Sequence, residues 1–137
     1  MAGGNGWIAT LRSVDTLIMA ITTQDMTLLS RLLDVAALRQ DVIAQNVANV
    51  NTPGYRTQEV AFEEALRQAL SQGGNGNLIA LKPDVITGSG GRTREDGNNV
   101  DVDLEMARLQ KNALYFKVYA QLLAGDLAQY RSAITGH

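Results

Sequence analysis

Three acidic residues at alternate positions, Asp101, Asp103 and Glu105, are the first candidates for chemistry in this sequence. Aspartates at this spacing occur in some phosphoryl-transfer enzymes and in calcium-binding loops. A calcium loop needs glycine at its sixth position and glutamate at its twelfth, and neither is present. Phosphoryl transfer needs a buried strand before the aspartates, whereas these follow the sequence Gly-Asn-Asn. We therefore interpret the three carboxylates as the first turn of a helix, where acidic side chains are favoured by the helix dipole.

The remaining candidates for catalysis are weaker. Glu63 and Glu64 are adjacent, and adjacent side chains on a helix point in different directions. The glycine-rich stretches 73–76 and 88–91 match neither the dinucleotide fingerprint nor the phosphate-binding loop, and we predict flexible loops there. The sequence has no cysteine, and its one histidine, His137, is the last residue. Thiolate chemistry is thus excluded. Because a terminal residue is rarely held in place, we also expect no histidine chemistry, and we predict no enzyme, no cofactor and no metal site.

Size and composition predict a single folded domain. The chain has 137 residues, of which 45% are hydrophobic and 19% charged, as expected for a protein with a buried core. A net charge of −2 gives no reason to expect nucleic acid as the partner. The apolar run Leu17–Ile21 is too short to span a membrane, and no basic cluster precedes it as in a signal peptide. We therefore expect no cleaved signal peptide.

Two long segments, residues 26–50 and 100–134, contain almost no glycine or proline. We predict that both are helices. We treat residues 1–25 as a partly disordered N-terminal extension. Apolar residues at heptad spacing predict an amphipathic first helix that can enter a coiled coil. Gln40 is the polar exception in this heptad, and it either fixes the register of a buried seam or lies at the edge of a globular helix packing. The heptad consists of Met26, Leu29, Leu33, Ala36, Gln40, Ile43, Val47 and Val50.

The second helix has two apolar stripes. Because a helix in a simple hairpin buries one stripe, two stripes predict packing on two sides, in a bundle or an assembly. The alternative is a helix buried deep within a monomer. The start of this second helix is marked by the N-cap candidates Asn98, Asn99 and Asp101. The heptad is Met106, Leu109, Ala113, Phe116, Ala120, Leu123, Leu127, Tyr130 and Ile134; the second stripe is Leu104, Leu114, Val118 and Leu122, with Tyr115 and Tyr119 beside it.

The middle of the chain, residues 51–99, predicts short elements and loops. Thr52-Pro53-Gly54 is typical of a turn, with proline at the first central position and glycine at the second. We expect an extended stretch at 55–60, a short helix at 62–70, and strands at 78–81 and 85–87 within a mobile, glycine-rich loop. The predicted fold is mainly α: two long amphipathic helices packed as a coiled-coil-like pair, with these short elements between them.

The segment around this turn resembles a family signature. In the flagellar rod and hook family the N-terminal helix ends in Ala-Asn, followed by two variable residues, Thr-Pro-Gly-Tyr and a basic residue. The matching residues here are Asn46, Ala48, Asn49, Thr52, Pro53, Gly54, Tyr55 and Arg56. The C-terminal half, with Asn99-Val-Asp-Val-Asp103-Leu-Glu105 and later Asn112-Ala-Leu-Tyr115, is similar to the short members that build the proximal rod.

The resemblance implies a structural subunit that is exported without a cleaved signal and polymerises in the periplasm. Its implied partners are itself, other rod proteins, the membrane ring at the rod junction and the export gate, with no nucleic acid and no small-molecule substrate. The apolar heptad positions from Met26 to Val47 and from Leu109 to Ile134 are then the predicted assembly interface. Two alternatives remain at this point: another rod member of the family, or a soluble coiled-coil adaptor or chaperone.

Overall fold

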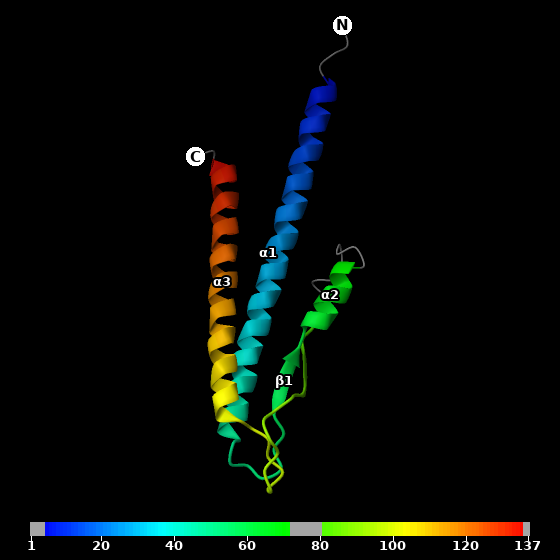
Figure 1. The fold of residues 1–137 in the computed structure, drawn as a ribbon. Coiled ribbons are helices and arrows are strands. Elements are labelled where there is room, and N and C mark those ends of the chain that lie inside the picture. The colour runs from blue at the N-terminus through cyan, green and yellow to red at the C-terminus, as the bar shows by residue number, and fades with distance from the viewer. Residues whose placement is uncertain (1–4, 72–80, 136–137) are drawn as a thin grey trace.

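The computed structural model describes the backbone of residues 5–71 and 81–135, and the side chains from Asp25 onward within these ranges. Two long helices dominate it, α1 (Asn5–Ala48) and α3 (Val102–Thr135). They lie side by side and antiparallel, and α1 continues beyond the end of α3 (Figure 1). At 1.5 Å per residue they are about 66 and 51 Å long. The predicted mainly α fold with a long helix near each end is confirmed.

The first helix starts well before residue 26. It is continuous from Asn5 to Ala48, so most of the segment treated as an extension belongs to the same helix as the heptad. Residues 1–4 lie outside the described part of the chain. In the described residues, no helix is both long and apolar enough to cross a membrane.

A small arm connects the long helices. Strand β1 (Gln58–Ala61) pairs with β2 (Asp84–Thr87) in an antiparallel register that places Gln58 opposite Thr87. Helix α2 (Glu63–Ser71) follows β1, so the short helix and the strand near 85–87 are both confirmed. Most of the strand expected at 78–81 lies outside the described residues, as does the glycine stretch 73–76.

The apolar core joins the arm to α1. Val35 and Val42 of α1 pack with Val60 of β1 and with Phe62, which precedes α2. Neither valine belongs to the predicted heptad. The heptad residue Gln40 is exposed, so it does not lie in a seam within the subunit. Four partly buried hydrophobic residues surround this core: Leu32, Leu38, Leu66 and Leu81.

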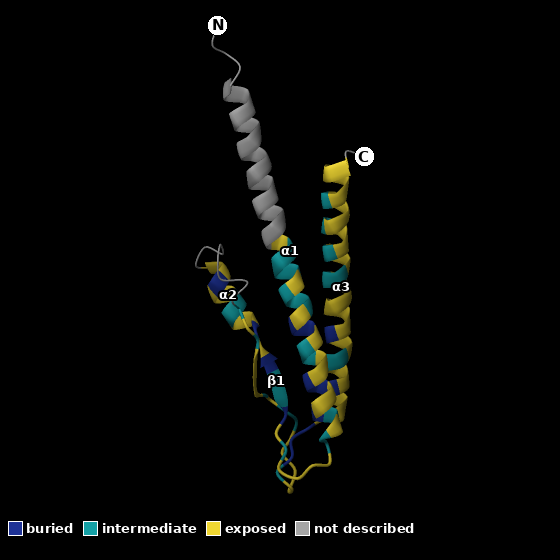
Figure 2. Cartoon of the chain, turned by 180° about the vertical axis from the view of Figure 1, so that it is seen from behind, coloured by how far each residue is buried: buried dark blue, intermediate teal, exposed yellow. Residues whose placement is uncertain are grey.

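Helix α3 packs on α1 through a mixed stripe rather than an apolar one. The stripe contains buried Glu105 and Asn112 and half-buried Asp126. Both outer flanks of α3 are exposed (Figure 2), which excludes the alternative of a helix buried deep within the monomer. The buried and half-buried residues of α3 are Glu105, Arg108, Leu109, Asn112, Tyr119, Ala120, Leu123, Asp126 and Tyr130.

Candidate functional site

The turn after α1 lies at the closed end of the molecule, where the chain leaves the helix for the arm (Figure 1). The backbone N–H of Tyr55 donates to the carbonyl of Thr52 at 3.2 Å, with Pro53 and Gly54 at the centre. Gly54 has φ +73°, which glycine adopts without strain. Its N–H donates to the carbonyl of Asp96 at 2.8 Å. The predicted Thr-Pro-Gly turn is therefore confirmed, and it also holds the loop before α3.

Asn46 connects three elements at this end. It is fully buried. Its amide donates to the carbonyl of Gln58 at 2.9 Å and to Glu105 Oε2 at 3.1 Å. Its Oδ1 accepts from the N–H of Gln58 at 3.0 Å and from the Tyr55 hydroxyl at 3.1 Å. Two donors and two acceptor positions are all that an asparagine amide has, so every one is used to join α1 to β1 and α3.

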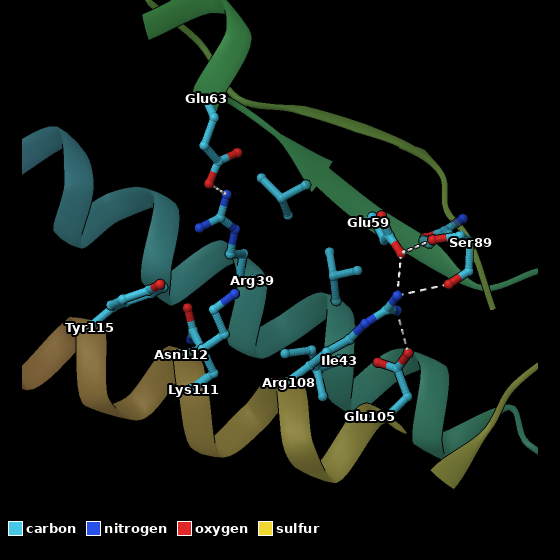
Figure 3. A pocket seen from close by; sticks show the side chains of 13 residues that line it. Arg39, Ile43, Glu59, Glu63, Ser89, Glu105, Arg108, Lys111, Asn112 and Tyr115 are labelled. Carbon is cyan, nitrogen blue, oxygen red and sulfur yellow. Dashed lines mark hydrogen bonds and ion pairs between the residues drawn. The ribbon is translucent and has the colours of Figure 1, made fainter. Parts of the chain in front are cut away.

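Glu105 is a buried carboxylate with two partners. Arg108 Nη1 donates to its Oε1 at 2.7 Å, opposite the bond from Asn46. Arg108 also donates to Glu59 of β1 and to the carbonyl of Ser89 (Figure 3). A buried charge is tolerated when it is paired and hydrogen-bonded in this way. Burial, and secondarily the charge of Glu105, raise the pKa of the Tyr55 hydroxyl, so this residue stays protonated as the donor to Asn46.

The acidic residues before α3 have separate roles. Asp101 is the N-cap, because its Oδ1 accepts from the N–H of Leu104 at 3.1 Å. The interpretation of this segment as a helix start is confirmed, and phosphoryl-transfer or calcium chemistry is not required to explain it. The prediction that Asn98 and Asn99 cap α3 is wrong, since α3 begins later, at Val102.

Asn98 instead holds the turn that follows α1. Its amide donates to the carbonyls of Asn49 at 2.9 Å and Thr52 at 2.8 Å, and its Oδ1 accepts from the N–H of Val100 at 2.8 Å. These carbonyls belong to residues that follow Ala48, so Asn98 joins the segment before α3 to the turn after α1. Asn99 performs a similar function for the arm, because its Oδ1 accepts from the N–H of Thr57 at 2.8 Å.

The glycine stretch 88–91 packs closely against Thr57 and Asn99. The N–H of Gly88 donates to Thr57 and that of Gly91 to Asn99, both at 2.8 Å. A Cβ on Gly90 would lie 2.2 Å from the carbonyl oxygen of Asn99. We predicted a flexible loop here; in the structure these glycines have specific hydrogen-bond partners and allow close approach of two backbone segments.

The predicted interface residues divide between inward and outward positions. Ala36 and Ile43 are buried within the subunit. Those half-buried are Met26, Leu29, Leu33, Val47, Leu109, Ala120, Leu123 and Tyr130. Those exposed are Ala113, Phe116, Leu127 and Ile134. One subunit alone does not test their role in assembly, which stays a prediction.

Comparison with known proteins identifies the family. The sequence profile described as "Flagella basal body rod protein" matches residues 33–56, which contain the end of α1 and the turn. The flagellar basal body rod protein FlgB of Borrelia hermsii is 34% identical to this chain, in a match that covers 77% of the chain and 92% of the relative. The chain belongs to the FlgB family of flagellar basal body rod proteins.

Other FlgB proteins support the assignment. The Bacillus subtilis protein is 31% identical over 79% of this chain and 91% of its own length. The Escherichia coli protein is 27% identical over 69% of this chain and 81% of its own length. The resemblance on which the sequence interpretation depended is thereby confirmed, and the structural role in the basal-body rod follows from the family. Neither alternative, a soluble coiled-coil adaptor or chaperone or another rod member of the family, is favoured by the fold or by these comparisons.

Proposed function

We propose that this chain is a subunit of the proximal rod and polymerises through the exposed flanks of α3. Ten large apolar side chains of α3 are more than a third exposed, a surface that soluble monomers rarely leave open. This is the observation that carries the proposal. The side chains are Val102, Leu104, Met106, Leu114, Tyr115, Phe116, Val118, Leu122, Leu127 and Ile134.

The fold suits a helical tube. An exposed apolar helix face that meets a different face of the next subunit makes a heterologous contact, and repetition of this contact produces an open helix. The hydrogen-bonded side chains of Asn46, Tyr55, Glu105 and Arg108 form a polar cluster. This cluster would keep the arm at a fixed angle to the helix pair, so that every subunit presents the same surfaces. In this proposal the chain has no enzymatic role and acts through contacts with other copies and with neighbouring rod proteins.

We further propose that the protein reaches the periplasm without a cleaved signal and joins the membrane ring and export gate to the rest of the rod. This part of the proposal is supported by the resemblance to the flagellar rod and hook family at Thr52, Pro53, Gly54 and Tyr55.

Leu122→Asp tests the assembly surface. Leu122 is 52% exposed, whereas Leu123 is half-buried against α1 and would report on folding as well. The matched control is Gln121→Asp, which introduces the same charge at the neighbouring exposed position. We expect L122D cells to export the subunit but not to swim, and Q121D cells to swim. Normal swimming of L122D cells would contradict the proposal.

A further inference from the structure

An apolar stripe runs along α3 for about five turns, on the side away from buried Glu105 and Asn112. All of its members are exposed (Figure 2), and they recur at spacings of three or four residues. Leu114 is 60% exposed. The stripe contains one charge, Lys111, which makes no ion pair within the described residues. We call this surface the outer stripe; it consists of Leu104, Ala107, Lys111, Leu114, Val118 and Leu122.

The surface that covers the outer stripe must differ from the stripe itself. Two outer stripes packed on each other would make an isologous contact, which closes a dimer and does not repeat. Helix α2 is too short, because its nine residues span about 14 Å and the outer stripe spans about 27 Å. Within the described residues, α1 has one exposed face of matching length and spacing, with small or acidic side chains. We call it the outer face of α1; it consists of Ser30, Asp34, Ala37, Asp41, Ala44 and Ala48.

We infer that the outer stripe of α3 packs on the outer face of α1 from a second copy of this chain; the inference rests on the proposed polymerisation. The two surfaces are complementary in size, because the leucine and valine side chains of the stripe meet mainly alanine and serine. Such small side chains leave a shallow groove along a helix, and the larger side chains of a neighbouring helix pack into it. The contact therefore covers the stripe, which a single subunit leaves in water.

The charges select an antiparallel register in which Lys111 meets Asp41. Neither residue has an ion pair within the described residues. A slide of seven residues in one direction would put Asp41 against Leu104, and a slide in the other would put Lys111 against Ala48. Asp34 already pairs with Arg31 of its own helix at 3.5 Å. The facing pairs are then Leu104 with Ala48, Ala107 with Ala44, Lys111 with Asp41, Leu114 with Ala37, Val118 with Asp34 and Leu122 with Ser30.

The same register makes successive copies run parallel. Within one subunit Asn112 lies level with Ala36, because its Nδ2 donates to the carbonyl of Ala36 at 2.7 Å. In the inferred contact Asn112 comes level with Gln40 of the next copy. The two levels differ by four residues, so each copy is shifted by about 6 Å along the helix axis, at 1.5 Å per residue. Each copy offers one outer stripe and one outer face, so the contact repeats without closing.

Crosslinking in purified basal bodies tests the register, and the absence of cysteine from the chain gives a clean background. A single-cysteine variant of α1, Ala37→Cys or Ala44→Cys, is co-expressed with one of α3, Ala107→Cys or Leu114→Cys, under a different tag, and the particles are oxidised. We expect dimers that carry both tags when Ala37→Cys is combined with Leu114→Cys, and when Ala44→Cys is combined with Ala107→Cys.

The two crossed combinations are the matched controls, because they use the same four variants. Their positions would lie about 10 Å out of register, beyond the roughly 7 Å between Cα atoms that a disulfide spans. They should give less dimer by about tenfold or more. An excess of dimer from the crossed combinations would indicate a parallel contact. That result, equal yields from all four combinations, or links only to another rod protein would overturn the inference.

Charge exchange provides a second test that does not depend on cysteine. Lys111→Asp brings two carboxylates together at Asp41, and like charges at an interface are unfavourable, so the swimming halo should shrink by about half or more. Adding Asp41→Lys in the same chain should restore it. The control is Lys82→Asp, the same change at an exposed position outside both surfaces, which should leave swimming unchanged.

This exchange decides if a cysteine keeps the subunit out of basal bodies. Normal swimming of K111D cells, or a double variant that swims no better than K111D, would overturn the inference. If L122D cells do not swim in the same assay, the proposed function stands and only the inferred contact is rejected. Normal swimming of both K111D and L122D cells would reject both.

Discussion

Replacing Asn46 with alanine removes the connection between α1, β1 and α3 in one step. The change deletes three neutral hydrogen bonds, two to the backbone of Gln58 and one from Tyr55, and one bond to the Glu105 carboxylate. Neutral bonds contribute about 1 kcal/mol each and a bond to a charged group about 2 kcal/mol. Allowing for water that enters the space left behind, the loss in free energy of unfolding is about 3–5 kcal/mol. A domain of this size has only about 5–15 kcal/mol in total.

Two measurements on the whole chain test this magnitude. Urea unfolding followed by circular dichroism gives the global loss, and hydrogen exchange of the Gln58 amide reports on the bond to Asn46 directly. The control is Gln45→Ala, at an exposed neighbouring position, which should change stability by less than about 0.5 kcal/mol. A loss below about 1 kcal/mol for Asn46→Ala, or unchanged protection of the Gln58 amide, would refute the assignment of Asn46 as the central connection.

Three further predictions concern Gly90, Gly125 of α3 and Glu63 of α2. Gly90→Ala should destabilise the chain by about 1–3 kcal/mol because the added Cβ would overlap the backbone of Asn99. Gly125→Ala should stabilise α3 by about 1 kcal/mol, because a Cβ at this position has no atom within 4 Å. The midpoints of urea unfolding compare the two variants. Partial burial works to raise the pKa of Glu63, but hydrogen bonds from Arg39 and from backbone N–H groups, with the Arg39 charge, hold it below the ordinary 4.5. The contribution of ionised Glu63 to the free energy of unfolding is therefore complete above pH 4.5. It is lost as the pH falls through the lowered pKa of Glu63 in the folded chain.

Each of these has an outcome that would contradict it. Equal urea midpoints for the two glycine variants would show that the close approach at Gly90 is relieved at no cost. For the acid dependence, Arg39→Gln isolates the contribution of this pair from that of other carboxylates. If this variant loses stability below pH 4.5 as steeply as the unmodified chain, Glu63 is not the cause.

Local signals were sufficient where the structure depends on neighbours in sequence. The Thr52-Pro53-Gly54 turn follows from the backbone preferences of proline and glycine, and the acidic first turn marked α3 correctly. The bonds of Asn46 join positions 59 residues apart at Glu105. No pattern within either helix indicates that these two side chains meet, so the polar cluster could not be derived from spacing.

Hydrophobic periodicity found the helices but not all of their contacts. In α3 the stripe that faces α1 contains the polar residues Asn112 and Asp126, so a search for apolar residues alone did not follow it. The predicted heptad therefore combines inward-facing residues such as Leu109 and Leu123 with exposed ones such as Met106 and Leu127. In α1 the arm packs on Val35 and Val42, adjacent to the heptad, because this helix is covered on two sides. A pattern built on one buried face does not separate a face covered within the subunit from one left for assembly.

The central claim, that this chain is a structural part of the rod, is tested most directly by quantitative mass spectrometry of purified hook–basal bodies. We predict that the chain is present in every preparation, in a constant ratio to the other rod proteins, and remains after the hook and filament are removed. Its absence from particles that contain the other rod proteins would contradict the account.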